Sequence, residues 1–205
     1  MRELDSYLTI EKTGVAEFKD RGSQFIGYAY PISSVADFKE KLAALKKKHP
    51  KATHHCFAYR LGLDSFNFRV SDDGEPSGSA GRPILGQIDS RSLTNVLIVV
   101  VRYFGGTSLG VPGLINAYKS TAAMALQVTP VVQKPIEVIY RIHFDYTKIN
   151  EVMTLIKQQH CSVRQQDMQL FCVMQIGIPK ANHDYCLEKL KEVQGIEIEE
   201  LKMPA

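Results

Sequence analysis

The sequence predicts an α+β protein with two domains, and two observations support this. From residue 136 to 201, the apolar periodicity gives the order strand, helix, strand, strand, helix, strand, which is the ferredoxin-like arrangement. Residues 1–130 also mix strands with helices, and Pro130 and Pro135 bracket a segment that we predict to be a linker. We therefore expect an N-terminal domain over residues 1–130 and a ferredoxin-like C-terminal domain over residues 131–205.

The start of the N-terminal domain is predicted to hold strands followed by a helix. Residues 8–31 favour two strands, the second over 24–30, because aromatic and β-branched residues are frequent there. Ser34 and Asp37 have the spacing of a capping box. The spacing of Val35, Phe38, Leu42 and Leu45 predicts a helix with these residues on its buried face, and Pro50 ends it.

A hairpin and a turn-rich segment should follow. His54 to Leu61 predicts one strand. Phe66 to Val70 predicts its partner, with Phe66, Phe68 and Val70 on a buried face. Asp73-Gly74 and Glu75-Pro76 are typical turn formers, and a helix is expected over 83–90.

The next segment predicts the centre of the sheet. The β-branched run over 95–102 is typical of a strand buried on both faces. A glycine-rich loop over 105–110 follows it, and small residues over 112–126 predict a helix that packs closely on a sheet. The C-terminal elements are expected as a strand over 136–144, a helix capped by Thr147, a hairpin of 161–165 with 169–178, a helix over 182–193 and a strand over 196–201.

Composition excludes some classes of protein. No apolar run approaches the ~20 residues of a membrane span, and no secretory signal is recognisable, so we expect no membrane association. The four cysteines form no C-x-x-C pair, which argues against a zinc ribbon and favours a reduced, cytoplasmic protein. The net charge of +3 is small, and the basic run Lys46-Lys47-Lys48 is interpreted first as a solvated helix end.

The glycine loop is the main candidate for ligand binding. Backbone N–H groups at a helix N-terminus favour anions, although a tight strand-to-helix turn explains the glycines somewhat better. Arg102 precedes the loop and either contacts a phosphate or pairs with Asp72 or Asp73. The predicted anion-binding residues are Arg102, Gly105, Gly106, Gly110, Arg82 and Lys119.

A second group of residues is predicted to line the same cleft: His54, His55, Asp72, Asp73, Glu75 and Tyr103. The carboxylates suit a hard cation or acid–base chemistry, but a simple turn explains them better. The two histidines should face opposite sides of a strand, so that His54 shares a face with Cys56. A Cys–His nucleophile is the less favoured reading, as is base stacking on Tyr103 or Phe104.

Three separated motifs resemble the YigZ/IMPACT family, in its bacterial two-domain form. They are HHCFAYRLG from His54, SDDGEPSGSAGRPIL from Ser71 and VVVRYFGGTSLGVPGLINAY from Val99. The resemblance implies an N-terminal domain of the left-handed βαβ type, like the second domain of a small-subunit ribosomal protein. It also implies a C-terminal domain similar to the fifth domain of elongation factor G. Eukaryotic relatives regulate translation, and the resemblance transfers no catalytic residue.

Two functions follow from these observations. The first is a non-catalytic regulator or accessory factor of translation that binds RNA or a ribosome-associated surface, without a cofactor. The alternative is a metal-assisted phosphoester or small-molecule hydrolase, which needs a histidine and two carboxylates of the cluster to converge. A protein–protein adaptor without a ligand stays open as well. The sequence assigns no metal site and no catalytic residue.

Overall fold

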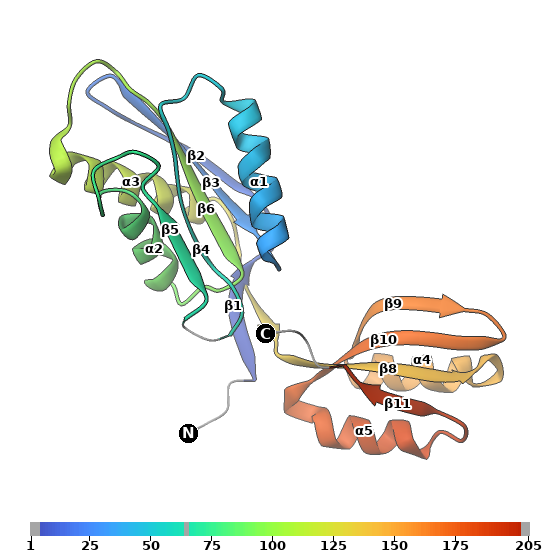
Figure 1. Ribbon diagram of the computed structural model, residues 1–205. Coiled ribbons are helices and arrows are strands. Elements are labelled where there is room, and N and C mark those ends of the chain that lie inside the picture. Colours follow the sequence, from blue (N-terminus) through green and yellow to red (C-terminus); the bar gives the residue numbers. More distant parts are fainter. Residues whose placement is uncertain (1–4, 64–65, 202–205) are drawn as a thin grey trace. The chain divides into compact units, whose positions relative to one another are not determined.

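The computed structural model describes residues 5–63 and 66–201 (Figure 1). Two compact units are present, and each is described by itself. The N-terminal unit is Tyr7–Lys134, and the chain from Pro135 onward forms most of the C-terminal unit. No helix within the described ranges is long and apolar enough to cross a membrane.

A five-stranded antiparallel sheet forms the centre of the N-terminal unit, in the order β2-β3-β6-β4-β5. The central strand β6 contains the predicted β-branched run, and residues 96–101 are completely buried. The prediction of a strand covered on both faces is therefore confirmed. The strands are β2 Gly14–Asp20, β3 Ser23–Pro31, β4 His54–Arg60, β5 Phe68–Ser71 and β6 Val96–Tyr103.

Helices cover both faces of this sheet (Figure 1). Helix α1 (Val35–Lys48) packs on one face, where Phe38 contacts the rings of Phe57 and Tyr59. Helices α2 (Gly81–Asp89) and α3 (Gly110–Gln127) cover the opposite face and form the larger apolar core.

The capping box predicted for α1 is present. The Asp37 N–H donates to Ser34 Oγ at 3.1 Å, and the Ser34 N–H donates to Asp37 Oδ2 at 3.2 Å. Two backbone donors that the helix leaves free are thereby satisfied. Val35, expected on the buried face, is 42% exposed because it lies in the first turn, at the edge of the packed surface.

Three other predictions for the N-terminal unit were wrong. Residues 8–31 hold parts of three strands rather than two, because β1 (Ser6–Ile10) precedes β2 and β3. The predicted linker is strand β7 (Val131–Pro135), which pairs with β1 in a separate two-stranded sheet. Phe66 lies before β5 and is 89% exposed, and Phe68 is 38% exposed, since β5 is an edge strand.

The C-terminal unit has a four-stranded sheet in the order β11-β8-β10-β9 and a core formed with helices α4 and α5. Its strands and helices follow the predicted order along the chain. One cap differs: Asp145, not Thr147, caps a short 3₁₀ turn, accepting the Thr147 N–H at 2.8 Å. The bounds are β8 Glu137–Asp145, α4 Ile149–Gln158, β9 Ser162–Met168, β10 Phe171–Pro179, α5 His183–Glu192 and β11 Glu197–Glu200.

Close packing of α3 on the sheet depends on glycines in β2 and β3. A Cβ atom at Gly14 would overlap the carbonyl oxygen of Ala125, and one at Gly27 would lie 2.9 Å from Thr121 Cγ2. The small residues of α3 therefore meet small residues of the sheet, as the sequence predicted for this helix.

We expect Gly14→Ala to destabilise the N-terminal unit by about 1–3 kcal/mol, because the added methyl group must displace backbone atoms of α3. Gly86→Ala is the matched control. Gly86 lies in α2 with nothing near its Cβ position, so alanine there should stabilise by about 0.5–1 kcal/mol. Urea denaturation measures both changes, and equal effects of the two substitutions would contradict the packing argument.

Candidate functional site

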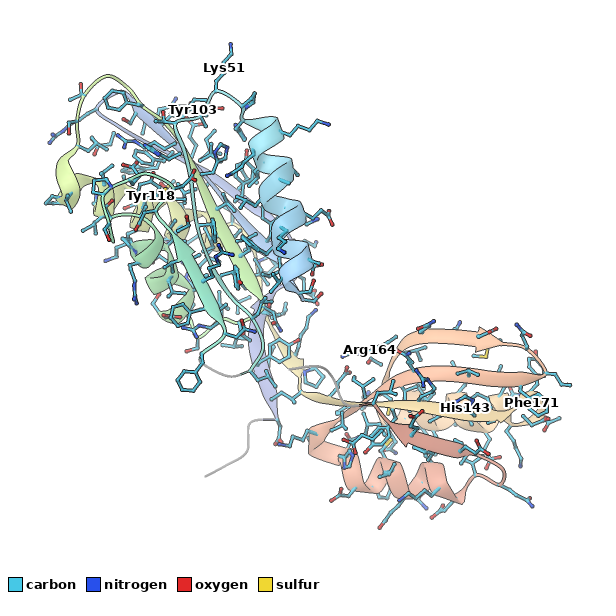
Figure 2. The ribbon with its side chains drawn as sticks, viewed as in Figure 1. Lys51, Tyr103, Tyr118, His143, Arg164 and Phe171 are labelled. Carbon is cyan, nitrogen blue, oxygen red and sulfur yellow. The ribbon has the colours of Figure 1, made fainter. Side chains whose placement is uncertain are left out.

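Arg102, Glu75 and Tyr118 form a buried polar cluster where β6 ends, which we call the Glu75 cluster. Arg102 Nη1 donates to Glu75 Oε1 at 2.6 Å, and the Tyr118 hydroxyl donates to the same oxygen at 2.8 Å. The side chains of Arg102 and Glu75 are only 6% and 4% exposed, and Tyr118 lies inside the unit (Figure 2). Charged groups buried this deeply are retained only when they are paired and hydrogen-bonded.

His54 and Cys56 border this cluster from β4. The Nδ1–H of His54 donates to the Asp73 carbonyl oxygen at 2.8 Å, and its Nε2 lies 3.8 Å from Glu75 Oε1. Cys56 Sγ lies 3.3 Å from the Tyr118 hydroxyl oxygen. Burial raises the pKa of the Cys56 thiol, which disfavours the thiolate that a nucleophile requires.

The remaining surroundings of Arg102 are aromatic and polar. Its Nη2 donates to Ser23 Oγ at 3.3 Å, and its guanidinium carbon lies 5.3 Å and 5.5 Å from the ring centroids of Phe25 and Phe104. Arg102 Nε is buried and makes no hydrogen bond with any residue that the structure describes. The two rings supply part of the cation's environment through cation–π contacts.

Backbone geometry accounts for the glycines of the predicted anion loop. Gly105 is in direct contact with the backbone of Gly22 in the β2–β3 turn, where any Cβ atom would overlap it. Gly106 and Gly110 have φ angles of +85° and +69°, which favour glycine. The Gly105 N–H donates to Ser23 Oγ at 3.2 Å, so this N–H is already satisfied.

The acidic residues stabilise turns rather than facing an open cleft. Asp72 accepts hydrogen bonds from the backbone N–H groups of Gly78, Ala80 and Gly81 at 2.8–3.0 Å. It thereby caps α2, which has no side-chain cap at its own N-cap residue. Partial burial opposes ionisation, but these three donors outweigh it and lower the pKa of the Asp72 carboxyl. Asp73 Oδ2 accepts the His55 N–H at 2.6 Å.

His55 and Tyr103 lie on the opposite face of the sheet, so the prediction that they line the same cleft was wrong. Alternate residues of a strand point to opposite faces, which separates Tyr103 from Arg102 and His55 from His54. The Tyr103 hydroxyl lies 2.8 Å from His49 Nδ1, and the Tyr28 hydroxyl lies 2.7 Å from His49 Nε2. Burial lowers the pKa values of both His49 and His55.

Arg102 pairs with Glu75 rather than with Asp72 or Asp73, the partners considered from sequence. Arg82 and Lys119 are exposed, and within the described ranges neither makes a hydrogen bond or ion pair with the Glu75 cluster. The described residues also contain no group of three or more His, Cys, Asp or Glu side chains placed to hold a metal ion.

Sequence reasoning missed Tyr118 and Ser23, the two hydroxyl residues of the site. Tyr118 lies four residues after Leu114, so the helical spacing places both on the buried face of α3. That spacing does not reveal that its hydroxyl reaches Glu75, which is 43 residues away in the chain. Ser23 carried no signal beyond its position after the turn glycine Gly22.

The residues of this site all lie in a region that matches a known protein family. A family model described as the Impact N-terminal domain matches residues 21–126, which include Ser23, Glu75, Arg102 and Tyr118. The chain belongs to the IMPACT family. The IMPACT family member YvyE of Bacillus subtilis is 36% identical over 166 residues, covering 78% of this chain and 76% of YvyE.

Another member of the IMPACT family is similar over both units. YigZ of Escherichia coli is 33% identical over 171 residues, covering 82% of this chain and 83% of YigZ. The crystal structure of a protein described as hypothetical matches with a TM-score of 0.75 at 27% identity, covering 98% of this chain and all of the other. The mixed α+β fold is therefore shared along nearly the whole chain.

We expect Arg102→Met to destabilise this IMPACT family member by about 3–5 kcal/mol, because Glu75 would stay buried without its cation. Adding Glu75→Gln to this variant removes the unpaired buried charge and keeps an oxygen that accepts the Tyr118 hydrogen bond. The double variant should therefore recover more than half of the loss in urea denaturation. Simple addition of the two single losses would contradict the pairing argument.

We expect Asp72→Asn to lower stability at pH 7 by about 1–2 kcal/mol, because Asn has one acceptor oxygen where Asp72 has two. The folded-state pKa of Asp72 is lowered, so its contribution is complete above about pH 4 and is lost as the pH falls through the folded value. The difference from the unmodified chain should therefore shrink below about pH 4. Asp167→Asn, at an exposed site, is the matched control and should change stability at pH 7 by less than about 0.5 kcal/mol in urea denaturation.

Proposed function

We propose that this chain is a non-catalytic regulator or accessory factor of translation that binds single-stranded RNA at the end of the N-terminal unit where β6 terminates. The observation that carries the proposal is Phe104, which is 53% exposed and lies next to the Arg102 guanidinium. An exposed ring beside an arginine guanidinium is a suitable platform for a nucleic-acid base.

Exposed lysines at the same end supply the charge that RNA binding requires. The segment 49–53, which carries Lys51, is attached to the end of β6: the Thr53 N–H donates to the Arg102 carbonyl at 2.8 Å, and the Phe104 N–H donates to Thr53 Oγ1 at 3.2 Å. Lys51 projects outward at the end of the unit where Tyr103 lies (Figure 2). Lys46, Lys47 and Lys48, in the last turn of α1, are exposed close by, since His49 contacts Tyr103.

The exposed Phe104 and the exposed lysines change how the predicted anion site is interpreted. Arg102 is neutralised by Glu75, so it positions Phe104 and the loop through Gly105 and Gly106 rather than acting as a free phosphate ligand. The phosphates would meet the lysines instead, with Arg82, Lys119 and the backbone at Gly110 as more distant contributors. Family membership supports a role in translation, because that is what the resemblance to eukaryotic relatives implies.

The hydrolase alternative has less support. Asp72 and Asp73 are both engaged by backbone N–H groups, and Glu75 is engaged by Arg102 and Tyr118. Among the histidines that the structure describes, His54 is the one near a carboxylate of the Glu75 cluster, with its Nε2 3.8 Å from Glu75 Oε1. The three carboxylates that the hydrolase alternative requires are therefore already engaged within the described part of the chain, which disfavours acid–base or metal-assisted chemistry there.

We also propose two domains, over residues 1–130 and 131–205, and the division of the chain into two compact units between Lys134 and Pro135 lies close to this boundary. The sheet order β11-β8-β10-β9 is the order of a ferredoxin-like fold, and it supports that assignment for the C-terminal domain. In the N-terminal domain, β3 and β4 are both antiparallel to β6 and are joined through α1, which is a βαβ crossover. That crossover supports the proposed likeness to a ribosomal protein domain.

We expect the chain to bind a short single-stranded RNA in fluorescence anisotropy, with an affinity that falls as salt rises. Phe104→Ala should weaken binding by about 1–3 kcal/mol without changing the salt dependence, because it removes a stacking surface and no charge. Lys51→Gln should make the slope of log K against log salt shallower by about 0.7, the value for one lost phosphate contact.

Tyr185→Ala is the matched control, because Tyr185 is a 55% exposed aromatic residue beside Lys189 in the C-terminal unit. It should leave RNA binding unchanged. Three results would contradict the proposal: no binding at low salt, binding that is insensitive to salt, or binding to ribosomal particles that survives removal of their RNA. Phosphodiester hydrolysis that depends on a divalent metal would contradict the non-catalytic role.

A further inference from the structure

Two thiols of the C-terminal unit face each other at close range. Cys161 Sγ and Cys186 Sγ are 3.4 Å apart, although the residues are 25 positions apart in the chain. Both cysteines are free. Cys161 is half-buried just before β9, and Cys186 is 1% exposed on the inner face of α5.

Local structure holds both sulfur atoms in place. The Cys161 N–H donates to the Ile156 carbonyl at 2.9 Å, which closes the turn after α4. Asn182 Nδ2, just before α5, donates to the Gln159 carbonyl oxygen at 2.9 Å and ties the same turn to the start of α5. These hydrogen bonds therefore fix the two segments of the chain that carry Cys161 and Cys186.

We propose that Cys161 and Cys186 are a modification site that closes to a reversible intramolecular disulfide when the protein meets hydrogen peroxide. A disulfide bond is about 2 Å long, so a small rotation of the two side chains brings the sulfur atoms together. The other two thiols have different neighbours: Cys172 Sγ lies 3.4 Å from the Gln169 carbonyl oxygen, and Cys56 belongs to the N-terminal unit.

The chemistry balances in two steps. One thiol of the pair is oxidised by peroxide to a sulfenic acid, with release of one water molecule. The second thiol then attacks that sulfur, forming the S–S bond and expelling the hydroxyl group with a proton as a second water. Peroxide is the oxidant and accepts two electrons in total, and an external dithiol returns them when it reduces the bond.

Electrostatics at the pair favours this reaction at Cys186. Either sulfur can donate the hydrogen bond between them, and with the Cys161 S–H as the donor this bond lowers the pKa of the Cys186 thiol, because it stabilises the neighbouring thiolate. The thiolate is the reactive form of a cysteine. In a reducing compartment such a bond is transient, and while it exists it links the corner between α4 and β9 to α5.

Peptide mapping of the full-length chain tests the site. The reduced protein is treated with a small excess of peroxide, quenched with catalase, unfolded and alkylated, and then digested without a reductant. We expect one cross-linked peptide pair containing Cys161 and Cys186, a fall from four alkylatable thiols to two, and full recovery with dithiothreitol.

Three variants serve as controls. Cys172→Ser should form the cross-link as the unmodified chain does, whereas Cys161→Ser and Cys186→Ser should lose it. Each of the latter two should instead give a sulfenic acid on the remaining cysteine, which dimedone traps. The proposal is overturned if peroxide leaves all four thiols alkylatable, if Cys56 or Cys172 enters the cross-link in comparable yield, or if the pair closes only after the protein is unfolded.

Discussion

The pairing of Arg102 with Glu75 holds the N-terminal unit together at the end where β6 terminates. Burying either charge alone costs several kcal/mol, so each residue requires the other. Through Arg102 the pair anchors the end of β6 and contacts Ser23 at the start of β3. Through Glu75 it fixes the turn before α2 and, by way of Tyr118, the middle of α3. One ion pair thus joins four elements that are distant in the sequence.

That pairing also decides what the surrounding residues are free to do. Glu75 neutralises the charge of Arg102, so the Glu75 cluster joins distant elements of the fold. Asp72 is likewise occupied as the cap of α2, and Gly105 is required for contact with Gly22. Phe104 and Lys51, by contrast, are exposed, and both lie on segments that are joined to the end of β6 by hydrogen bonds.

The cysteines of the two units lie in different environments. In the N-terminal unit the cysteine, Cys56, is buried and its pKa is raised, so it serves as packing beside Tyr118. In the C-terminal unit the thiols of Cys161 and Cys186 meet each other, and their hydrogen bond lowers the pKa of Cys186. The same residue type is inert in one environment and suited to oxidation in the other, since neighbours control whether a thiolate is accessible.

Local patterns in the sequence determined most of the secondary structure. The capping box at Ser34, the β-branched run of β6 and the strand–helix order of the C-terminal unit depend on residues close together in the chain, so they are readable without a structure. Strand β7 was mistaken for a linker because its partner β1 lies more than 120 residues earlier, and no local pattern encodes that pairing.

The sequence by itself also placed the candidate site residues between His54 and Lys119 and indicated the family resemblance. Only the tertiary structure decided which of those residues meet. Strand alternation sends Arg102 and Tyr103 to opposite faces, and the fold, not the spacing, brings Glu75 rather than Asp72 or Asp73 to Arg102. The physical reason is that side-chain identity is local information, whereas the burial that makes an ion pair obligatory arises only when distant elements pack.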